Sequence, residues 1–326
     1  LHQDVHSFPT RRSSDLVFTK RIRFIFGTDE ETLWRCMNRY NQLEEKADLG
    51  FAPDSAFPLT YAEKGLLQVK LHGPGWEDHP LQAGRALNVV PDKATYKGDR
   101  LEELLPVIEQ SGVKYTEEAG AVTVLGLSKH SKDAAEGVNA IVGLAESLSL
   151  IQPHPALLFI ADAVGEDATG AALFGKIKDE PSGALSFNIA TLSIDEQQSE
   201  IGIDIRIPVL ADKDALVERL TEVAASYQLQ YEEFDYVAPL YVPLDSPLVS
   251  TLMAVYQEET GDQTPAMSSG GATFARTMEN CVAYGALFPD ALQTEHQANE
   301  RAKLDDLYRA MEIYVETIRR LAAKEA

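Results

Sequence analysis

Hydrophobic and polar residues alternate over residues 21–26, and the segment is rich in residues that favour strands, so we predict a strand there. Gly27 ends the alternation, and Thr28 or Asp29 is suited to cap a helix over residues 30–46. A strand, a tight turn and a helix in this order place functional groups at the carboxyl end of the strand. That position is the usual site in open α/β sheets.

From residue 64 to residue 238 the pattern changes to short strands and separate helices. After a strand at 59–63, we predict strands at 66–71, 87–90, 113–116, 121–127, 185–192 and 200–207, and helices at 101–111, 137–150 and 213–226. Because these elements do not alternate strictly, they indicate an α+β domain.

Long amphipathic helices return after residue 239. We predict them at 247–260, 271–278 and 295–324, with a strand at 281–287. The change of pattern on both sides therefore predicts an α/β domain, residues 17–63 plus 239–326, that is interrupted by an α+β domain, residues 64–238. A cleft between two such domains is a natural place for a ligand.

Residues 1–16 differ from the rest of the chain. His, Ser, Arg and Pro dominate there, and neither a strand period nor a helix period is present. The run at residues 7–16 resembles translated adapter sequence more than an element of a fold, so we set residues 1–16 aside as a non-native-looking leader. The alternative is a disordered natural tail. In either case the native-looking sequence begins near Val17, in the middle of a domain.

Composition narrows the classes of protein that the chain can represent. Its 326 residues predict about two domains of roughly 150 residues each. The formal net charge of −22 repels phosphate backbones and argues against nucleic acid as a partner. No run of 18 apolar residues is present, so we expect no membrane span. Cys36 and Cys281 do not make a disulfide framework, which suits a cytoplasmic location.

Carboxylates gather at the predicted start of the first helix. Asp29, Glu30 and Glu31 are consecutive, and Asp54 follows Glu31 by 23 residues. Two neighbouring glutamates can divide the work of a metal hydrolase, one binding the ion and the other moving protons on the water that the ion activates. From the residues alone, the alternative is that these acids only complement the helix dipole.

Three motifs together resemble the bacterial PepV-type dipeptidases, which belong to the aminoacylase and carnosinase group of metallopeptidases. They are Gly-Thr-Asp-Glu-Glu at residues 27–31, Gly-Phe-Ala-Pro-Asp at 50–54 followed by Phe-Pro at 57–58, and Ala-Glu-Lys-Gly at 62–65. The resemblance extends from about residue 17 to the C-terminus. It implies a two-domain metallopeptidase, with an α/β catalytic domain and an inserted α+β lid domain.

The resemblance also implies which residues act at the metal site. It makes Glu30 the catalytic general base, and Glu31 and Asp54 carboxylate ligands of the metal. His296 corresponds to the family's C-terminal histidine ligand, whereas from the residues alone a histidine at this position is more often a cap or a surface residue. A complete site of the family holds two divalent cations, which we expect to be zinc, with manganese as the alternative.

Substrate-binding residues are implied in the same way. His130 corresponds to the histidine that polarises the substrate carbonyl, and Asn88 to the asparagine that reaches the substrate. Arg206 corresponds to the arginine that holds the substrate carboxylate, a task that suits the bidentate guanidinium, although a surface-facing position in the strand is the alternative. Gly270 and Gly271 correspond to a turn that lets the backbone approach the substrate, although a plain loop has the same pattern.

The sequence departs from the family upstream of Glu30. The family carries a His-x-Asp motif and a bridging aspartate there, and the only similar residues, His2, Asp4 and His6, lie in the segment set aside above. We therefore expect an N-terminally truncated, monomeric metallo-dipeptidase whose hydrolysis of dipeptides by a metal-activated water is impaired. The alternatives are an N-acyl-amino-acid deacylase such as a desuccinylase, and a non-catalytic fragment.

Overall fold

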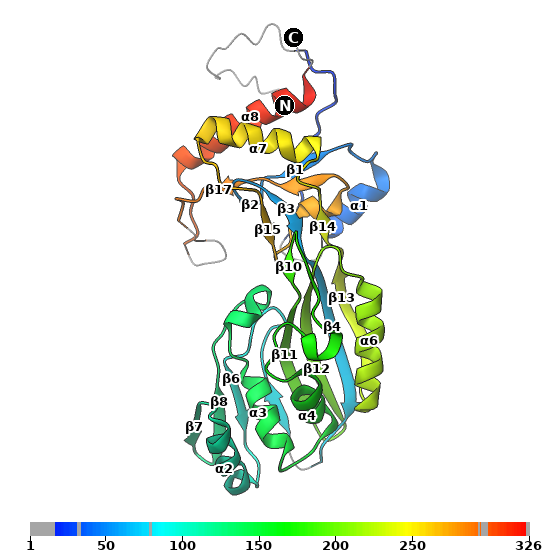
Figure 1. Cartoon of the computed structure of the whole chain (residues 1–326), viewed down its shortest axis with the longest axis vertical. Coiled ribbons are helices and arrows are strands. Elements are labelled where there is room, and N and C mark those ends of the chain that lie inside the picture. Colours follow the sequence, from blue (N-terminus) through cyan, green and yellow to red (C-terminus); the bar gives the residue numbers. More distant parts are fainter. Residues whose placement is uncertain (1–16, 31–33, 78–79, 293, 295–298, 324–326) are drawn as a thin grey trace. The chain divides into compact units, whose positions relative to one another are not determined.

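The computed structural model describes residues 17–30, 34–77, 80–292, 294 and 299–323, and Figure 1 shows their elements. The chain divides into two compact units. The first unit comprises Leu1–Tyr61, Val242–Met267 and Thr273–Ala326, and the second comprises Ala62–Tyr241 and Ser268–Ala272. A lid function for the second unit stays a prediction.

Two short parallel strand pairs, which belong to two different sheets, lie in the first unit. β1 (Gly50–Ala52) pairs with β16 (Cys281–Ala283), and β2 (Ser55–Ala56) pairs with β17 (Ala286–Leu287). The other elements of this unit are α1 (Arg35–Leu43), α7 (Pro247–Thr260), the 3-10 helix η4 (Phe274–Thr277) and α8 (Leu304–Ala322). Helix α7 packs against α8. The strands β3 (Thr60–Glu63) and β15 (Met267–Ser269) each run from one unit into the other.

Aromatic side chains pack around Phe57 in the first unit. The Phe57 side chain is 2% exposed, and its ring centroid lies 5.2 Å from those of Tyr256 and Tyr284 and 4.7 Å from that of Phe288. Phe57 follows Asp54 by only three residues. The packing of Phe57 therefore fixes the course of the chain that carries Asp54.

A five-stranded antiparallel sheet in the order β13-β4-β12-β11-β5 is the largest sheet described in the second unit. Its strands are β4 (Gly65–Pro74), β5 (Leu81–Ala83), β11 (Ser186–Ile194), β12 (Gln198–Ile207) and β13 (Gln230–Val237). In this register Asp204 lies between Gln68 and Asn188, and Arg206 lies opposite Ser186. Because residues directly opposite each other share a face of the sheet, these five polar side chains lie on one face.

Helices cover the sheet of the second unit. Helix α3 (Ala140–Ser149) buries nine of its ten residues and packs against β11, and α6 (Lys213–Ser226) packs against β13. The remaining elements are β6 (Lys93–Tyr96), α2 (Leu101–Ser111), β7 (Tyr115–Glu118), β8 (Ala121–Leu125), η2 (Ser131–Glu136), α4 (Pro155–Leu158), η3 (Phe159–Val164), α5 (Ala171–Phe174), β9 (Lys178–Asp179), β10 (Gly183–Ala184) and β14 (Leu240–Tyr241).

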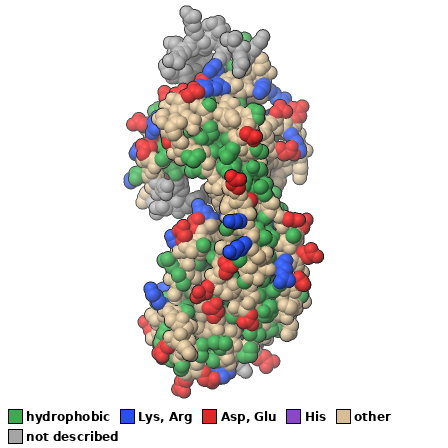
Figure 2. All heavy atoms as spheres, viewed as in Figure 1, with side chains coloured by type: hydrophobic (Ala, Val, Ile, Leu, Met, Phe, Trp, Pro, Cys, Tyr) green, Lys and Arg blue, Asp and Glu red, His purple; other side chains and the backbone are tan. Residues whose placement is uncertain are grey.

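Acidic and basic side chains are interspersed with hydrophobic ones on the face shown in Figure 2. The acidic excess of the chain is therefore spread over that face rather than gathered in one patch. Across the described residues, the helices are all too short or too polar to cross a membrane.

Three helices, α2, α6 and α7, have the bounds that the sequence predicts. Local signals mark their ends. The side chains of Asp212 and Ser246 cap α6 and α7, and Gly112 and Gly261, both with positive φ, end α2 and α7. The strands β4, β11 and β12 also overlap the predicted strands.

Several predicted elements are wrong or too long. No strand is present at 21–26, where Phe24 and Phe26 are 71% and 89% exposed. An alternating segment becomes a strand only where a partner accepts its backbone hydrogen bonds, and the described residues provide no partner here. Helix α1 begins at Arg35 rather than at residue 30, and α8 begins at Leu304. The predicted helix at 271–278 is only the 3-10 helix η4, which its cap Thr273 precedes.

Residues 87–90 form a turn instead of the predicted strand. Val89 makes only an isolated bridge with His130. The carbonyl groups of Val89 and Leu87 instead accept hydrogen bonds from the Asn188 side chain at 3.0 and 3.4 Å. A side-chain amide thus replaces a neighbouring strand as the partner of this backbone.

Gly285→Ala should destabilise the first unit more than Gly261→Ala does. Both residues have positive φ, so either substitution carries left-handed strain of about 1–2 kcal/mol. A Cβ at Gly285 would also lie between 2.4 and 2.7 Å from ring atoms of Phe57, whereas nothing lies within 4 Å at Gly261. The overpacking should cost a further ~1–3 kcal/mol of folding free energy. Urea denaturation measures both variants, and equal losses would contradict the close packing of Phe57.

Candidate functional site

The acidic turn before α1 uses its first carboxylate to cap the helix. Asp29 accepts hydrogen bonds from the backbone N–H groups of Arg35 at 2.9 Å and Cys36 at 3.1 Å. Hydrogen bonds from the Cys36 side chain and from these backbone groups hold the pKa of Asp29 well below its ordinary value. Glu30 is partly buried, and its carbonyl accepts from the Trp34 indole N–H. Asp29 therefore serves the helix, whereas the general-base role of Glu30 stays a prediction.

Asp54 lies in the link between β1 and β2 and is exposed. The adjacent Ser55 donates its N–H to the Gly285 carbonyl at 2.7 Å, and the parallel pairs with β16 and β17 hold the chain on either side. Asp54 thus follows the carboxyl end of a parallel strand, where open α/β sheets place their ligands.

The predicted metal site is only partly within the described residues. Glu31 and His296 lie outside them. Within the described ranges, no group of three or more His, Cys, Asp and Glu side chains could hold a metal ion. Asp54 is therefore the one predicted ligand that the described residues include, and its role as a ligand stays a prediction.

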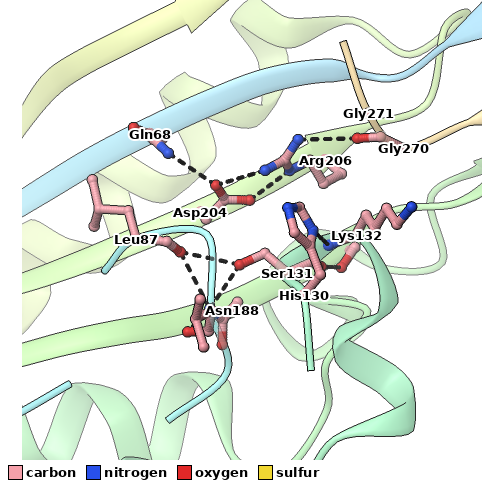
Figure 3. Close-up of polar contacts among 12 residues, drawn as sticks. Gln68, Leu87, His130, Ser131, Lys132, Asn188, Asp204, Arg206, Gly270 and Gly271 are labelled. Atoms are coloured by element: carbon pink, nitrogen blue, oxygen red, sulfur yellow. Dashed lines mark hydrogen bonds and ion pairs between the residues drawn. The ribbon is translucent and has the colours of Figure 1, made fainter. Parts of the chain in front are cut away.

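A buried ion pair joins Arg206 to Asp204 in the second unit (Figure 3). Arg206 is 4% exposed and Asp204 is 0% exposed. Arg206 Nε donates to Asp204 Oδ1 at 2.7 Å, and Nη2 donates to Oδ2 at 3.1 Å. The side-chain amide of Gln68 also donates to Oδ2, at 3.0 Å. The buried carboxylate is thus held by a bidentate cation and an amide.

The glycine turn at 270–271 is tied to the same arginine. Arg206 Nη1 donates to the Gly270 carbonyl at 2.9 Å, and the Gly271 N–H donates to Ser269 Oγ at 2.9 Å. A Cβ at Gly270 would lie 2.6 Å from Cβ of Lys132. Only glycine allows this close approach of the turn to the segment that carries Lys132.

His130 offers a neutral ring. Its Nδ1 accepts a hydrogen bond from the backbone N–H of Lys132 at 3.1 Å, which leaves the proton of the neutral ring on Nε2. Although the residue as a whole is exposed, partial desolvation of the ring lowers the pKa of His130, and the positive charges of Arg206 and Lys132 lower it further. The ring therefore stays neutral, with its proton on Nε2, down to a lower pH than an ordinary histidine does.

Asn88 is exposed in the turn at 87–90, and its carbonyl accepts from the Ser131 N–H at 2.9 Å. This bond brings the segment of Asn88 next to that of His130. The predicted catalytic residue His130 lies in the second unit, and so do the four predicted substrate-binding residues, Asn88, Arg206, Gly270 and Gly271.

Sequence reasoning missed the residues that support these side chains. Asp204 could have been found, because it precedes Arg206 by two residues in an apolar strand and so shares its face. Asn188 has a weaker signal, the alternation of Ser186 and Asn188 in a buried strand. Lys132 has no sequence signal, because its contact with Gly270 depends on the tertiary fold.

The pattern that describes peptidase family M20/M25/M40 matches residues 6–320. The match begins inside the segment 1–16 that looks non-native by sequence alone. This chain belongs to that peptidase family, whose metallopeptidases use divalent metal ions.

The chain is similar to bacterial proteins and to one group of solved structures. It is 35% identical over 335 residues to "Putative dipeptidase YtjP" of Bacillus subtilis (strain 168), with 95% of this chain and 72% of that protein covered. It is 31% identical over 331 residues to "Putative dipeptidase MW1694" of Staphylococcus aureus (strain MW2), with 94% and 71% covered. The structure of aminoacylhistidine dipeptidase from Vibrio alginolyticus aligns with a TM-score of 0.47 and 13% identity, over 86% of this chain and 67% of that chain. Likeness at this last level carries no information on activity.

Arg206→Met should destabilise the second unit by about 3–5 kcal/mol, because Asp204 would remain buried without its cation. Arg219→Met is the matched control, since its ion pair with Glu222 is exposed and worth about 0–1 kcal/mol. Adding Asp204→Leu to Arg206→Met should recover most of the loss. Urea denaturation measures all three, and a loss for Arg206→Met no larger than for the control would show that Asp204 does not depend on Arg206.

The pKa of His130 should lie below the ordinary histidine value of about 6.5. The unfolded chain then binds this proton more readily, so stability should fall as the pH drops from the unfolded pKa to the lowered folded pKa. Lys132→Met removes one cation and should raise the pKa of His130, whereas Lys129→Met, which loses a pair with Glu136, should not. NMR titration of the ring protons tests this. A pKa of His130 at or above the ordinary value would refute it.

Proposed function

We propose that this chain hydrolyses dipeptides with the help of divalent cations, zinc or manganese. Membership of peptidase family M20/M25/M40 supports a peptidase activity, and relatives at 35% and 31% identity with dipeptidase in their names support the substrate class. In this proposal Glu30 is the general base that takes a proton from the attacking water. Glu31, Asp54 and His296 bind the cations.

The observation that carries the proposal is the anchored Arg206 beside the Gly270 turn. Three of the five guanidinium N–H groups donate to Asp204 and Gly270, and the other two donate to no residue in the described part of the chain. These two N–H groups are suited to the C-terminal carboxylate of a dipeptide, which matches their charge.

His130 and Asn88 supply neutral contacts to the rest of the substrate. The Nε2–H of His130 donates to the carbonyl oxygen of the scissile bond, on which negative charge develops during attack. Arg206 and Lys132 oppose a second proton on the ring and so favour this neutral donor. Asn88 adds an amide that can both donate and accept.

Glu30→Gln should lower kcat for a free dipeptide by about 10²–10⁴-fold, since the amide cannot take a proton from water. The assay uses the purified chain with added zinc or manganese. Glu44→Gln, an exposed residue just after α1, is the control and should leave kcat unchanged. Equal kcat for Glu30→Gln and the control would remove Glu30 from the reaction.

An N-acetylated dipeptide, assayed in parallel, tests the substrate class. The proposal expects faster release of the C-terminal amino acid from the free dipeptide than from the N-acetylated one. The reverse order would favour an N-acyl-amino-acid deacylase, and turnover of neither compound would favour a non-catalytic fragment.

A further inference from the structure

The loops that carry Asn88 and His130 have little regular structure of their own. Asn88 lies in a turn, His130 immediately precedes η2, and Val89 and His130 share only an isolated bridge. Both residues are exposed as a whole, so burial alone does not hold them. Because both must meet one substrate, another group has to set their relative position.

Asn188 on β11 is placed to do this. Its side chain is buried, with 1% exposure. Nδ2 donates to the Val89 carbonyl at 3.0 Å and to Ser131 Oγ at 3.0 Å (Figure 3). One buried amide therefore ties the turn that carries Asn88 to the residue that follows His130.

Ser131 completes the connection. Its hydroxyl accepts from Asn188 and donates to the Leu87 carbonyl at 3.0 Å, so it is used both as an acceptor and as a donor. Its N–H donates to the Asn88 carbonyl at 2.9 Å, and its carbonyl accepts from Ser186 Oγ. Every polar group of this residue thus bonds either to the turn or to β11.

The register of the sheet connects this amide to the arginine. Asn188 and Ser186 lie opposite Asp204 and Arg206, so the amide and the ion pair share one face. Asn188 Oδ1 also accepts from Nδ2 of Asn139 at 3.2 Å, and Asn139 caps α3. Both ends of the Asn188 amide are therefore held, which fixes its orientation.

Resting on the proposed function, we propose that Asn188 is a positioning residue for dipeptide hydrolysis. Its amide fixes Asn88 and His130 relative to each other and relative to Arg206. Asn188 touches no reacting atom. If the Asn188 amide were merely structural, its loss would destabilise the unit but would not change the position or the hydrogen bonding of the His130 ring. Stability alone therefore does not separate the two roles, whereas kinetics and the ring signals do.

Asn188→Leu removes the amide with little change in volume. Gln152→Leu is the matched control, because it removes another buried amide of the second unit, which accepts from the Tyr96 hydroxyl at 2.8 Å. We expect Asn188→Leu to lower kcat/KM for a free dipeptide by about 10- to 100-fold, the cost of a misplaced catalytic group. The loss should fall mainly on kcat, because Arg206 still binds the carboxylate. Gln152→Leu should leave kcat/KM unchanged.

The nitrogen NMR shifts of the His130 ring give a readout that does not need turnover. They report which ring nitrogen carries the proton, and His130→Gln assigns the signals. Asn188→Leu should change these shifts, whereas Gln152→Leu should not. In the His130→Gln background, Asn188→Leu should lower kcat by a smaller factor, because one of the groups that it positions is already absent.

Ser131→Ala tests the same connection by a smaller change, the loss of one hydroxyl, and serves if Asn188→Leu does not fold. It should alter kcat and the ring shifts in the same direction. Unchanged kcat/KM in the variants would overturn the positioning role even if stability falls. An inactive parent chain would defeat the proposed function, and the ring shifts would then decide the inference: shifts that depend on Asn188 support it, and unchanged shifts overturn it.

Discussion

A guanidinium buried on a central strand has to be paired, and the pairing of Arg206 with Asp204 is the constraint on which the polar face of the second unit depends. Desolvating both charges offsets much of their attraction, so the pair contributes geometry more than net stability. Because Asp204 holds two guanidinium nitrogens, the third is directed to the Gly270 carbonyl. The position of the glycine turn thus follows from that of the strand.

The same face of the sheet also binds the turn at 87–90 and the segment that carries Ser131. It does so through buried polar side chains rather than through the backbone hydrogen bonds of paired strands. Asn188 on β11 donates to the turn at 87–90 and to Ser131, and Ser186 donates to the Ser131 carbonyl. Because His130 directly precedes Ser131, these bonds also restrict the position of the exposed His130. A site on loops gains precision when a rigid element supports it. Here one row of the sheet supports the arginine, the glycine turn and the two loops together.

The sequence was sufficient where the signal is local. Helices α6 and α7 are delimited by the caps Asp212 and Ser246, which act within a few residues of themselves. It failed where the outcome depends on distant groups. Residues 87–90 have the composition of a strand, but the amide of Asn188, about a hundred residues away, takes their carbonyl groups. For the same reason the resemblance to a family assigns roles to Asn88, His130 and Arg206 but does not point to Asn188 or Asp204, whose contacts depend on the tertiary fold.

In the acidic turn, the structure supports the helix-capping interpretation for Asp29, and the general-base role of Glu30 stays a prediction. Asp29 acts as the helix-capping acid, because its carboxylate accepts from the first N–H groups of α1 and its pKa is lowered by them. Had the helix begun at residue 30, as its pattern predicts, Glu30 would lie in the first turn of the helix, and the helix would set the direction of its side chain. Since α1 begins at Arg35, Glu30 lies before the helix, next to a residue that the helix itself holds in place. The hydrogen bonds from the first turn of α1 to Asp29 therefore fix the chain immediately before Glu30.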